Sequence, residues 1–186
     1  MEDYVNYLSL VLLNTGTGFM ILAGFLLAGR LTEFTRWIPG FLVTGFISVL
    51  FGLHIVITWP LPASYNIAFG EPVFLSGILF LVLGFSLLKD WSLLSVGIYS
   101  FFAGLASVLI GVKVYLLKLS LIPELAAMIF LFSGISGMSL FLFTLYDNKF
   151  TRGFSAFFLF LSSLLVLATA YMAYWSHLET FSGWVP

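Results

Sequence analysis

The chain has 186 residues, of which 61% are hydrophobic and only 8% are charged. A soluble domain of this composition could not cover its surface with polar groups, so a soluble fold is excluded. The net charge of -1 offers no positive patch for nucleic acid, and the absence of Cys excludes disulfides, thiolate nucleophiles and Cys-bound metals.

Six apolar runs follow one another, separated by polar or Pro-containing clusters, and each approaches the roughly 20 residues that a helix needs to span a bilayer. The chain therefore predicts membrane-spanning helices over residues 5–29, 38–59, 73–88, 92–117, 123–146 and 154–175. The acidic start Met1-Glu2-Asp3 argues against a cleaved signal peptide. We expect a single transmembrane domain over residues 1–186, an all-α polytopic membrane protein surrounded by lipid.

Basic residues between the runs predict the orientation. The connections after the first, third and fifth spans contain five of them, namely Arg30, Arg36, Lys89, Lys149 and Arg152, against Lys113 and Lys118 on the other side. Cytoplasmic loops are enriched in Lys and Arg, so we expect both termini outside the cell membrane. The Trp residues lie at span ends or in the tail, as interfacial indoles do: Trp37, Trp59, Trp91, Trp175 and Trp184. Residues 60–72 form the longest connection and predict a structured entrance loop on the outside.

A weak internal repeat relates the two ends of the chain. Phe34-Thr35-Arg36 recurs as Phe150-Thr151-Arg152 at an offset of 116 residues, and Trp59 matches Trp175 at the same offset. The middle pair of spans follows the same course, so we expect three similar two-helix hairpins around an axis along the membrane normal.

Small polar residues at helical spacing mark two of the spans. Asn14, Thr15 and Thr17 lie in the first, and Ser133 and Ser136 lie in the fifth. Such residues allow helices to pack closely, and they also offer hydrogen-bonding groups along a narrow path for a polar solute. Both interpretations stay open, and we take these residues as candidates for lining a pore.

Polar and ionisable residues near the outer span ends are candidates for a pore mouth: His54, Asn66, Glu71, Lys113, Glu124 and His177. Snorkelling explains Lys113 equally well, and helix N-termini explain both carboxylates. We predict an ion pair between Lys113 and Glu124 across the outer turn. The two His could sense external acidity, whereas haem ligation would require both within facing spans, and His177 follows the last one.

No catalytic pattern is present. The chain lacks a nucleophile elbow, paired His at zinc spacing and a phosphate-binding glycine loop. We therefore expect no enzyme activity, no metal and no cofactor.

Short motifs resemble those of the small amide and urea channel family. They are Asp90-Trp91, Tyr99-Ser100-Phe101-Phe102-Ala103, the region from Gly70 to Pro72, and Lys149-Phe150-Thr151. The resemblance implies three hairpins around a pore in each protomer and a homo-oligomer, which is a hexamer in bacterial members. It also implies that Phe130 and Ser133 stand where that family has constricting Trp residues. The family's Glu in the last helix is replaced by the apolar stretch 156–161, which argues against a urea-selective constriction.

The segment Pro60-Leu61-Pro62, continued by Tyr65-Asn66-Ile67 and Phe69-Gly70-Glu71, resembles an uncharacterised and mainly archaeal family of polytopic membrane proteins. Together these observations favour a passive channel for a small, mostly uncharged solute such as urea, an amide or ammonia. Two alternatives are a non-transporting accessory subunit of a membrane complex and a haem- or quinone-binding redox subunit.

Overall fold

The computed structural model describes residues 7–28, 34–180 and 182–183. Within these residues, six helices are long and apolar enough to cross a membrane, which confirms the predicted all-α polytopic fold. In chain order the helices are α1 (Leu8–Ala28), α2 (Ile38–Thr58), α3 (Glu71–Lys89), α4 (Leu94–Leu116), α5 (Pro123–Leu145) and α6 (Lys149–Thr180). A 3-10 turn over Phe34–Trp37 precedes α2, and a π-helical turn over Asn66–Gly70 leads into α3.

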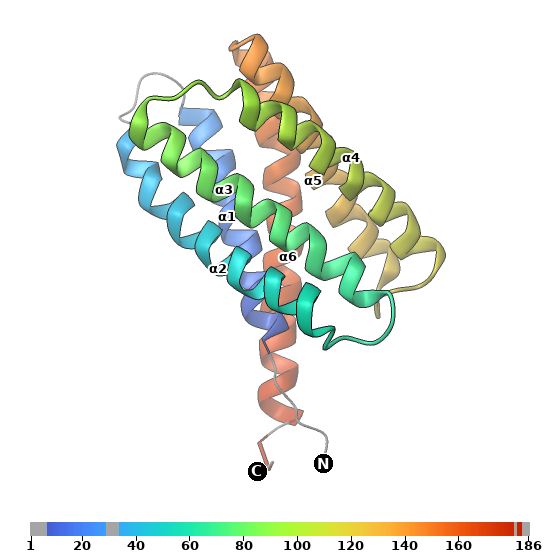
Figure 1. Ribbon diagram of the computed structural model, residues 1–186. Coiled ribbons are helices and arrows are strands. Elements are labelled where there is room, and N and C mark those ends of the chain that lie inside the picture. The colour runs from blue at the N-terminus through green and yellow to red at the C-terminus, as the bar shows by residue number, and fades with distance from the viewer. Residues whose placement is uncertain (1–6, 29–33, 181, 184–186) are drawn as a thin grey trace.

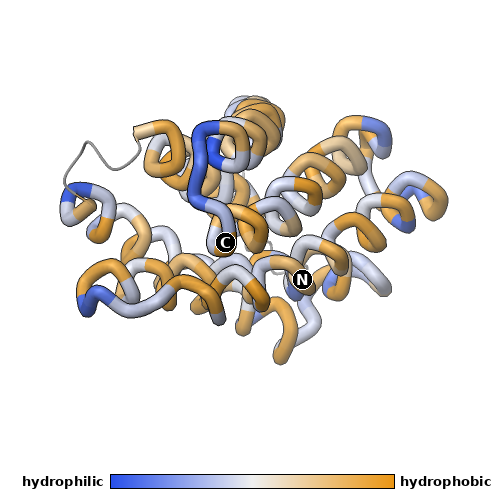
Figure 2. The backbone as a smooth tube through the Cα atoms, turned by 90° about the horizontal axis from the view of Figure 1, so that it is seen from above, coloured by the Kyte–Doolittle hydropathy of each residue, from blue (hydrophilic) through white to orange (hydrophobic). Residues whose placement is uncertain are grey.

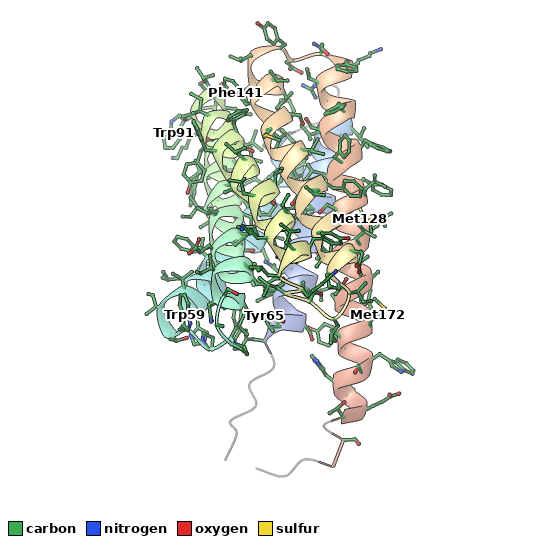
Figure 3. The ribbon with its side chains drawn as sticks, turned by 90° about the vertical axis from the view of Figure 1, so that its right-hand side faces the viewer. Trp59, Tyr65, Trp91, Met128, Phe141 and Met172 are labelled. Carbon is green, nitrogen blue, oxygen red and sulfur yellow. The ribbon has the colours of Figure 1, made fainter. Side chains whose placement is uncertain are left out.

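The helices run alternately up and down, so that α1 begins and α6 ends at the same end of the bundle (Figure 1). We call this the terminal end, and the other the opposite end. The connections from α2 to α3 and from α4 to α5 lie at the terminal end. Helix α6 has 32 residues, and at 1.5 Å per residue it is about 48 Å long, more than the roughly 30 Å of hydrocarbon in a bilayer. Its last turns accordingly project beyond the other helices (Figures 1 and 3).

Two helices begin earlier than the apolar pattern predicts. The predicted outer loop 60–72 is helical from Asn66 onward, because Pro72 lies in the first turn of α3, where no backbone N–H is required. Helix α6 begins at Lys149, because the side-chain oxygen of Asn148 accepts hydrogen bonds from the backbone N–H groups of Phe150 (2.9 Å) and Thr151 (3.0 Å). Residues 5, 6 and 29 of the first predicted span lie outside the described residues, as do Arg30 and Trp184.

The tightest helix pairs are α2 with α3, α4 with α5, and α1 with α6. Consecutive helices are neighbours, as the predicted hairpins require. The closest backbone contacts, however, lie within the three tightest pairs, whose two helices meet at the terminal end of the bundle. A Cβ atom at Gly45 would lie 2.6 Å from the backbone nitrogen of Leu81, and one at Gly104 would lie 2.6 Å from the carbonyl oxygen of Gly134. Without a hydrophobic drive between helices in lipid, such close contacts are what holds them together.

The three pairs share a repeat of 59 residues. Gly45 of α2, Gly104 of α4 and Ser163 of α6 stand at this interval and each faces the partner helix of its pair. At Gly45 and Gly104 the backbones touch directly, whereas at Ser163 the hydroxyl donates a hydrogen bond to the carbonyl oxygen of Gly16 at 2.7 Å. The bundle therefore has three related helix pairs, which agrees with the threefold arrangement predicted from the 116-residue offset.

The outer surface of the bundle suits a lipid environment. Hydrophilic residues gather near the turns and the helices between them are hydrophobic (Figure 2). Trp59 and Tyr65 lie at the terminal end and Trp91 at the opposite end (Figure 3), and both indoles are exposed. Exposed Trp residues at the two ends of a helical bundle are typical of interfacial anchoring.

Candidate functional site

A cavity of about 600 Å³ runs along the inside of the bundle, and all six helices contribute to its wall. The lining extends from Ser9 and His177 at the terminal end to Val96 and Thr144 at the opposite end. Among the described residues, no Asp, Glu, Lys or Arg lines it. The cavity is therefore long and mainly apolar with scattered hydroxyl groups, and in the part of the chain that the structure describes its wall carries no carboxylate, ammonium or guanidinium group to hold an ion.

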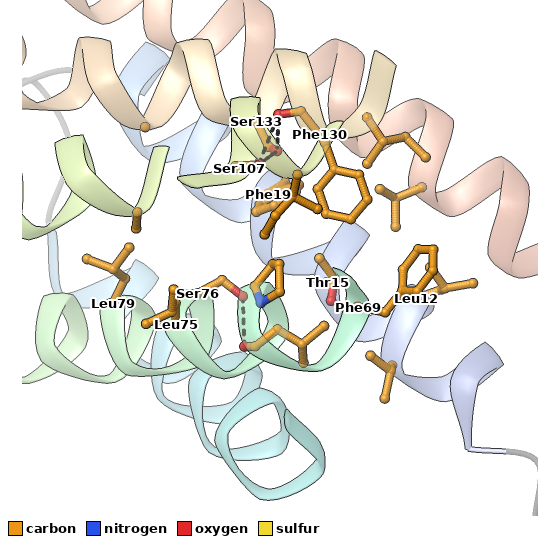
Figure 4. A pocket seen from close by; sticks show the side chains of 18 of the residues that line it. Leu12, Thr15, Phe19, Phe69, Leu75, Ser76, Leu79, Ser107, Phe130 and Ser133 are labelled. Atoms are coloured by element: carbon orange, nitrogen blue, oxygen red, sulfur yellow. Dashed lines mark hydrogen bonds between the residues drawn. The ribbon is translucent and has the colours of Figure 1, made fainter. Parts of the chain in front are cut away.

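Aromatic rings line the part of the cavity nearer the terminal end (Figure 4). The ring of Phe69, from the π-helical turn before α3, lies 5.9 Å from the ring of Phe130 on α5. Tyr65 stacks on Phe69 at the same distance, 5.9 Å between ring centroids. Farther along, Phe19 of α1 meets Phe80 of α3 edge to face at 6.3 Å. Aromatic rings from several helices therefore give this part of the cavity an apolar wall, which suits a small uncharged molecule better than a hydrated ion.

A hydroxyl pair borders the same part of the cavity (Figure 4). Ser107 of α4 donates to the backbone carbonyl oxygen of Phe130 at 2.9 Å, and its oxygen lies 3.1 Å from that of Ser133. Ser133 also lies within hydrogen-bonding distance of the Phe130 carbonyl, at 3.1 Å. The pair thus fixes α4 against α5 and at the same time places two oxygen atoms beside the cavity.

Of the predicted pore-lining residues, Thr15, Phe130 and Ser133 line the cavity, and His177 from the predicted mouth lines its terminal end. Thr15 is unusual in having a buried hydroxyl oxygen without a hydrogen-bonding partner among the described residues. The Nδ1 atom of His177 lies 3.2 Å from the hydroxyl oxygen of Ser9, so the end of α6 contacts the start of α1.

Three predicted pore-lining residues do not line the cavity. The side-chain amide of Asn14 donates to the carbonyl oxygen of Thr44 (2.9 Å) and to the hydroxyl of Ser48 (2.8 Å), so it joins α1 to α2. Ser136 is fully buried and donates to the carbonyl oxygen of Ser155 on α6 at 2.9 Å. Thr17 faces outward and donates to the carbonyl oxygen of Leu13 in its own helix. At these positions the structure follows the helix-packing interpretation.

The predicted mouth residues are dispersed. Asn66 is buried and closes the loop before it, because its amide donates to the carbonyl oxygens of Leu61 and Ala63 and its oxygen accepts from the Leu61 N–H at 2.8 Å. The side chains of His54, Glu71 and Lys113 are exposed and do not line the cavity.

The predicted ion pair between Lys113 and Glu124 is wrong, because the carboxylate of Glu124 pairs with a different lysine. The ammonium of Lys118 lies 3.6 Å from the Glu124 carboxylate. Helix α4 ends at Leu116 and the backbone turns left-handed at Lys118, with φ 55°, which carries this side chain toward the start of α5. Both groups are exposed, so the pair contributes little to stability.

Comparison with models of protein families identifies the family of the chain. The model of the family described as "Protein of unknown function (DUF981)" matches residues 1–180. The chain belongs to the DUF981 family. No curated protein matches the sequence of this DUF981 protein.

Among solved structures, this DUF981 protein is similar to the Helicobacter pylori urea channel, determined by cryo-electron microscopy in a closed state. The TM-score is 0.73 with 16% sequence identity, and the match covers 96% of this chain and 100% of the other. At this identity the likeness shows a shared fold. It confirms the architectural resemblance that the sequence motifs indicate.

Sequence reasoning missed several residues that line the cavity of this DUF981 protein, chiefly Ser107, Ser76 and Phe69. A signal for Ser107 exists, since it stands 59 residues after Ser48, whose hydroxyl also contacts a neighbouring helix. No comparable signal marks Phe69, because it lies in the segment predicted as a loop. Within the described residues no three His, Asp or Glu side chains gather as metal ligands would.

Proposed function

We propose that this DUF981 protein is a passive channel or facilitator for a small, mostly uncharged solute such as urea, a short amide or ammonia. The observation that carries the proposal is the cavity itself, which extends from residues of the terminal end to residues of the opposite end. A path that follows the helices through the bundle is the shape that transmembrane passage requires. The similarity in fold to a urea channel supports this proposal.

The chemistry of the wall favours neutral solutes. An ion that enters must lose much of its hydration, at a cost of several kcal/mol, and among the described residues no charged group of the lining offsets this cost. A neutral polar molecule loses only a few hydrogen bonds, and hydroxyl groups such as those of Ser107 and Ser133 replace some of them. The same wall therefore admits urea or ammonia and excludes sodium or chloride.

The test is solute flux into proteoliposomes followed by stopped-flow light scattering. Vesicles containing the protein should equilibrate urea, acetamide or ammonia faster than protein-free vesicles of the same lipid, and should remain impermeable to sodium chloride. If none of the neutral solutes shows a protein-dependent rate, the proposal fails.

Orientation and assembly form part of the same proposal. Arg36, Lys89, Lys149 and Arg152 all lie at the opposite end of the bundle, which supports placing that end in the cytoplasm and both termini outside the cell membrane. We also expect a homo-oligomer. A hexamer is the assembly that the resemblance to the amide and urea channel family implies. Labelling of a C-terminal tag in intact cells tests the orientation, and native mass spectrometry of the detergent-solubilised protein tests the subunit number.

A further inference from the structure

A second, smaller hollow lies beside the central cavity, between α4 and the segment that connects α2 to α3. Its volume is about 270 Å³. Of the residues that line it, Ala68 and Val114 are buried, whereas Ile67, Leu109 and Leu117 are exposed. The hollow is therefore a groove that opens on the outer surface of the bundle, where the protein meets lipid.

The lining of the groove suits a hydrocarbon chain better than water. Apart from Ser64 and Lys113, every residue that lines it is apolar. A bound water molecule needs about two to four polar partners, which this lining does not offer. If the groove stayed empty, its walls would lose their dispersion contacts. In a membrane, the acyl chain of a lipid is the flexible apolar group that can fill it.

One charged group borders this apolar groove. Lys113 lines it from the last turn of α4, and its side chain is exposed. In the part of the chain that the structure describes, no carboxylate pairs with its ammonium, because Glu124 pairs with Lys118 and Asp147 with Arg152. A charge at the edge of the hydrocarbon is costly unless it reaches water or an anion. An ammonium beside an apolar groove can hold the phosphate of a lipid whose chain fills the groove.

The groove lies at the depth where headgroups meet acyl chains. Tyr65, from the segment that forms one side of the groove, lies with Trp59 at the terminal end of the bundle (Figure 3). Such rings mark the headgroup level of a membrane. Leu109 precedes Lys113 by about one helical turn and lies on the same face of α4, farther from the terminal end. The ammonium therefore lies nearer the phosphates and Leu109 nearer the acyl chains.

We infer that this groove binds a phospholipid, with the phosphate against the ammonium of Lys113 and one acyl chain between α4 and residues 64–68. An anionic lipid such as phosphatidylglycerol is preferred, because a choline headgroup brings its own cation to the same place. The inference does not depend on the proposed channel function. Ile110 and Leu119 line both the groove and the central cavity, so the bound chain packs against the outside of the cavity wall.

Native mass spectrometry tests the headgroup half of the site. The protein is released from nanodiscs that contain equal amounts of phosphatidylglycerol and phosphatidylcholine, and the wild type should retain phosphatidylglycerol in preference. Lys113→Gln should weaken this binding by about fivefold, the contribution expected of one Lys near a membrane surface. Lys118→Gln is the matched control, because it removes the same charge nearby, does not line the groove and already has Glu124 as its partner. Equal losses in the two variants would show only a general surface attraction and would overturn the inference.

A photoreactive phosphatidylglycerol with a diazirine in its acyl chain tests the other half on the folded wild-type protein. Crosslinks should concentrate on residues 64–68 and 109–119. Glycerol phosphate, which has the same phosphate but no acyl chain, should not compete even in excess. Even labelling of all lipid-facing helices, or displacement by glycerol phosphate, would contradict a lipid held in this groove.

Discussion

Gly104 lies where the backbones of α4 and α5 come closest, so adding one methyl group there should force the helices apart. A Cβ atom at this position would lie 2.6 Å from the carbonyl oxygen of Gly134, 2.7 Å from the nitrogen of Met138 and 3.0 Å from the carbonyl carbon of Gly137. All three are backbone atoms, so no side-chain rotation relieves the clash. Forcing extra volume into a packed contact costs roughly 1–3 kcal/mol, and we expect Gly104→Ala to lose this much stability.

Reversible unfolding of the protein in mixed micelles by sodium dodecyl sulfate, followed by Trp fluorescence, measures this loss. The matched control is Gly153→Ala in α6, where a Cβ atom meets nothing within 4 Å. Alanine is the better helix former by up to about 1 kcal/mol, so this control should be neutral or stabilising. Equal stability of the two variants would refute the argument that close backbone contact holds α4 against α5.

Three further predictions concern single side chains. Asn14→Ala removes both hydrogen bonds from α1 to α2 and should lower the free energy of unfolding by about 1–2 kcal/mol, and an unchanged unfolding curve would count against this role. Asn66→Ala removes the hydrogen bonds of Asn66 to Leu61 and Ala63 and should cost about 1–3 kcal/mol while making residues 60–65 more sensitive to limited proteolysis; wild-type resistance would contradict it. Glu124→Gln removes only an exposed pair with Lys118 and should change stability by less than about 1 kcal/mol in the same assay, so a larger loss would disprove this view of the pair.

The transmembrane fold follows from the sequence because it depends on length and hydrophobicity, which each segment carries by itself. The helix starts at Asn66 and Lys149 were missed for a local reason. Pro72 and Asn148 read as loop residues, yet one is compatible with a first helical turn and the other caps the helix that follows.

The structure reveals a shorter repeat interval than the sequence does. The matching residues in the sequence stand 116 apart, which is close to two of the 59-residue units at which Gly45, Gly104 and Ser163 contact their partner helices. A search for identical residues does not detect a glycine contact that becomes a serine hydrogen bond.

The cavity lining could be predicted only in part. Whether a polar residue in an apolar helix faces a cavity, a neighbouring helix or lipid depends on the rotation of that helix about its axis. Asn14 and Thr15 are adjacent in sequence, yet Asn14 forms hydrogen bonds to α2 whereas Thr15 lines the cavity. Because these helices are apolar on every side, the hydrophobic pattern does not set that rotation.

Blocking the cavity tests most directly whether it is the path of the solute. Ala106 lines the cavity from α4, whereas Leu109 on the same helix is 61% exposed on the outer surface. Ala106→Trp places an indole in the passage and should reduce protein-dependent urea flux to the level of protein-free vesicles, while Leu109→Trp should conduct like the wild type. A correctly folded Ala106→Trp variant that still conducts urea at the wild-type rate would contradict the account.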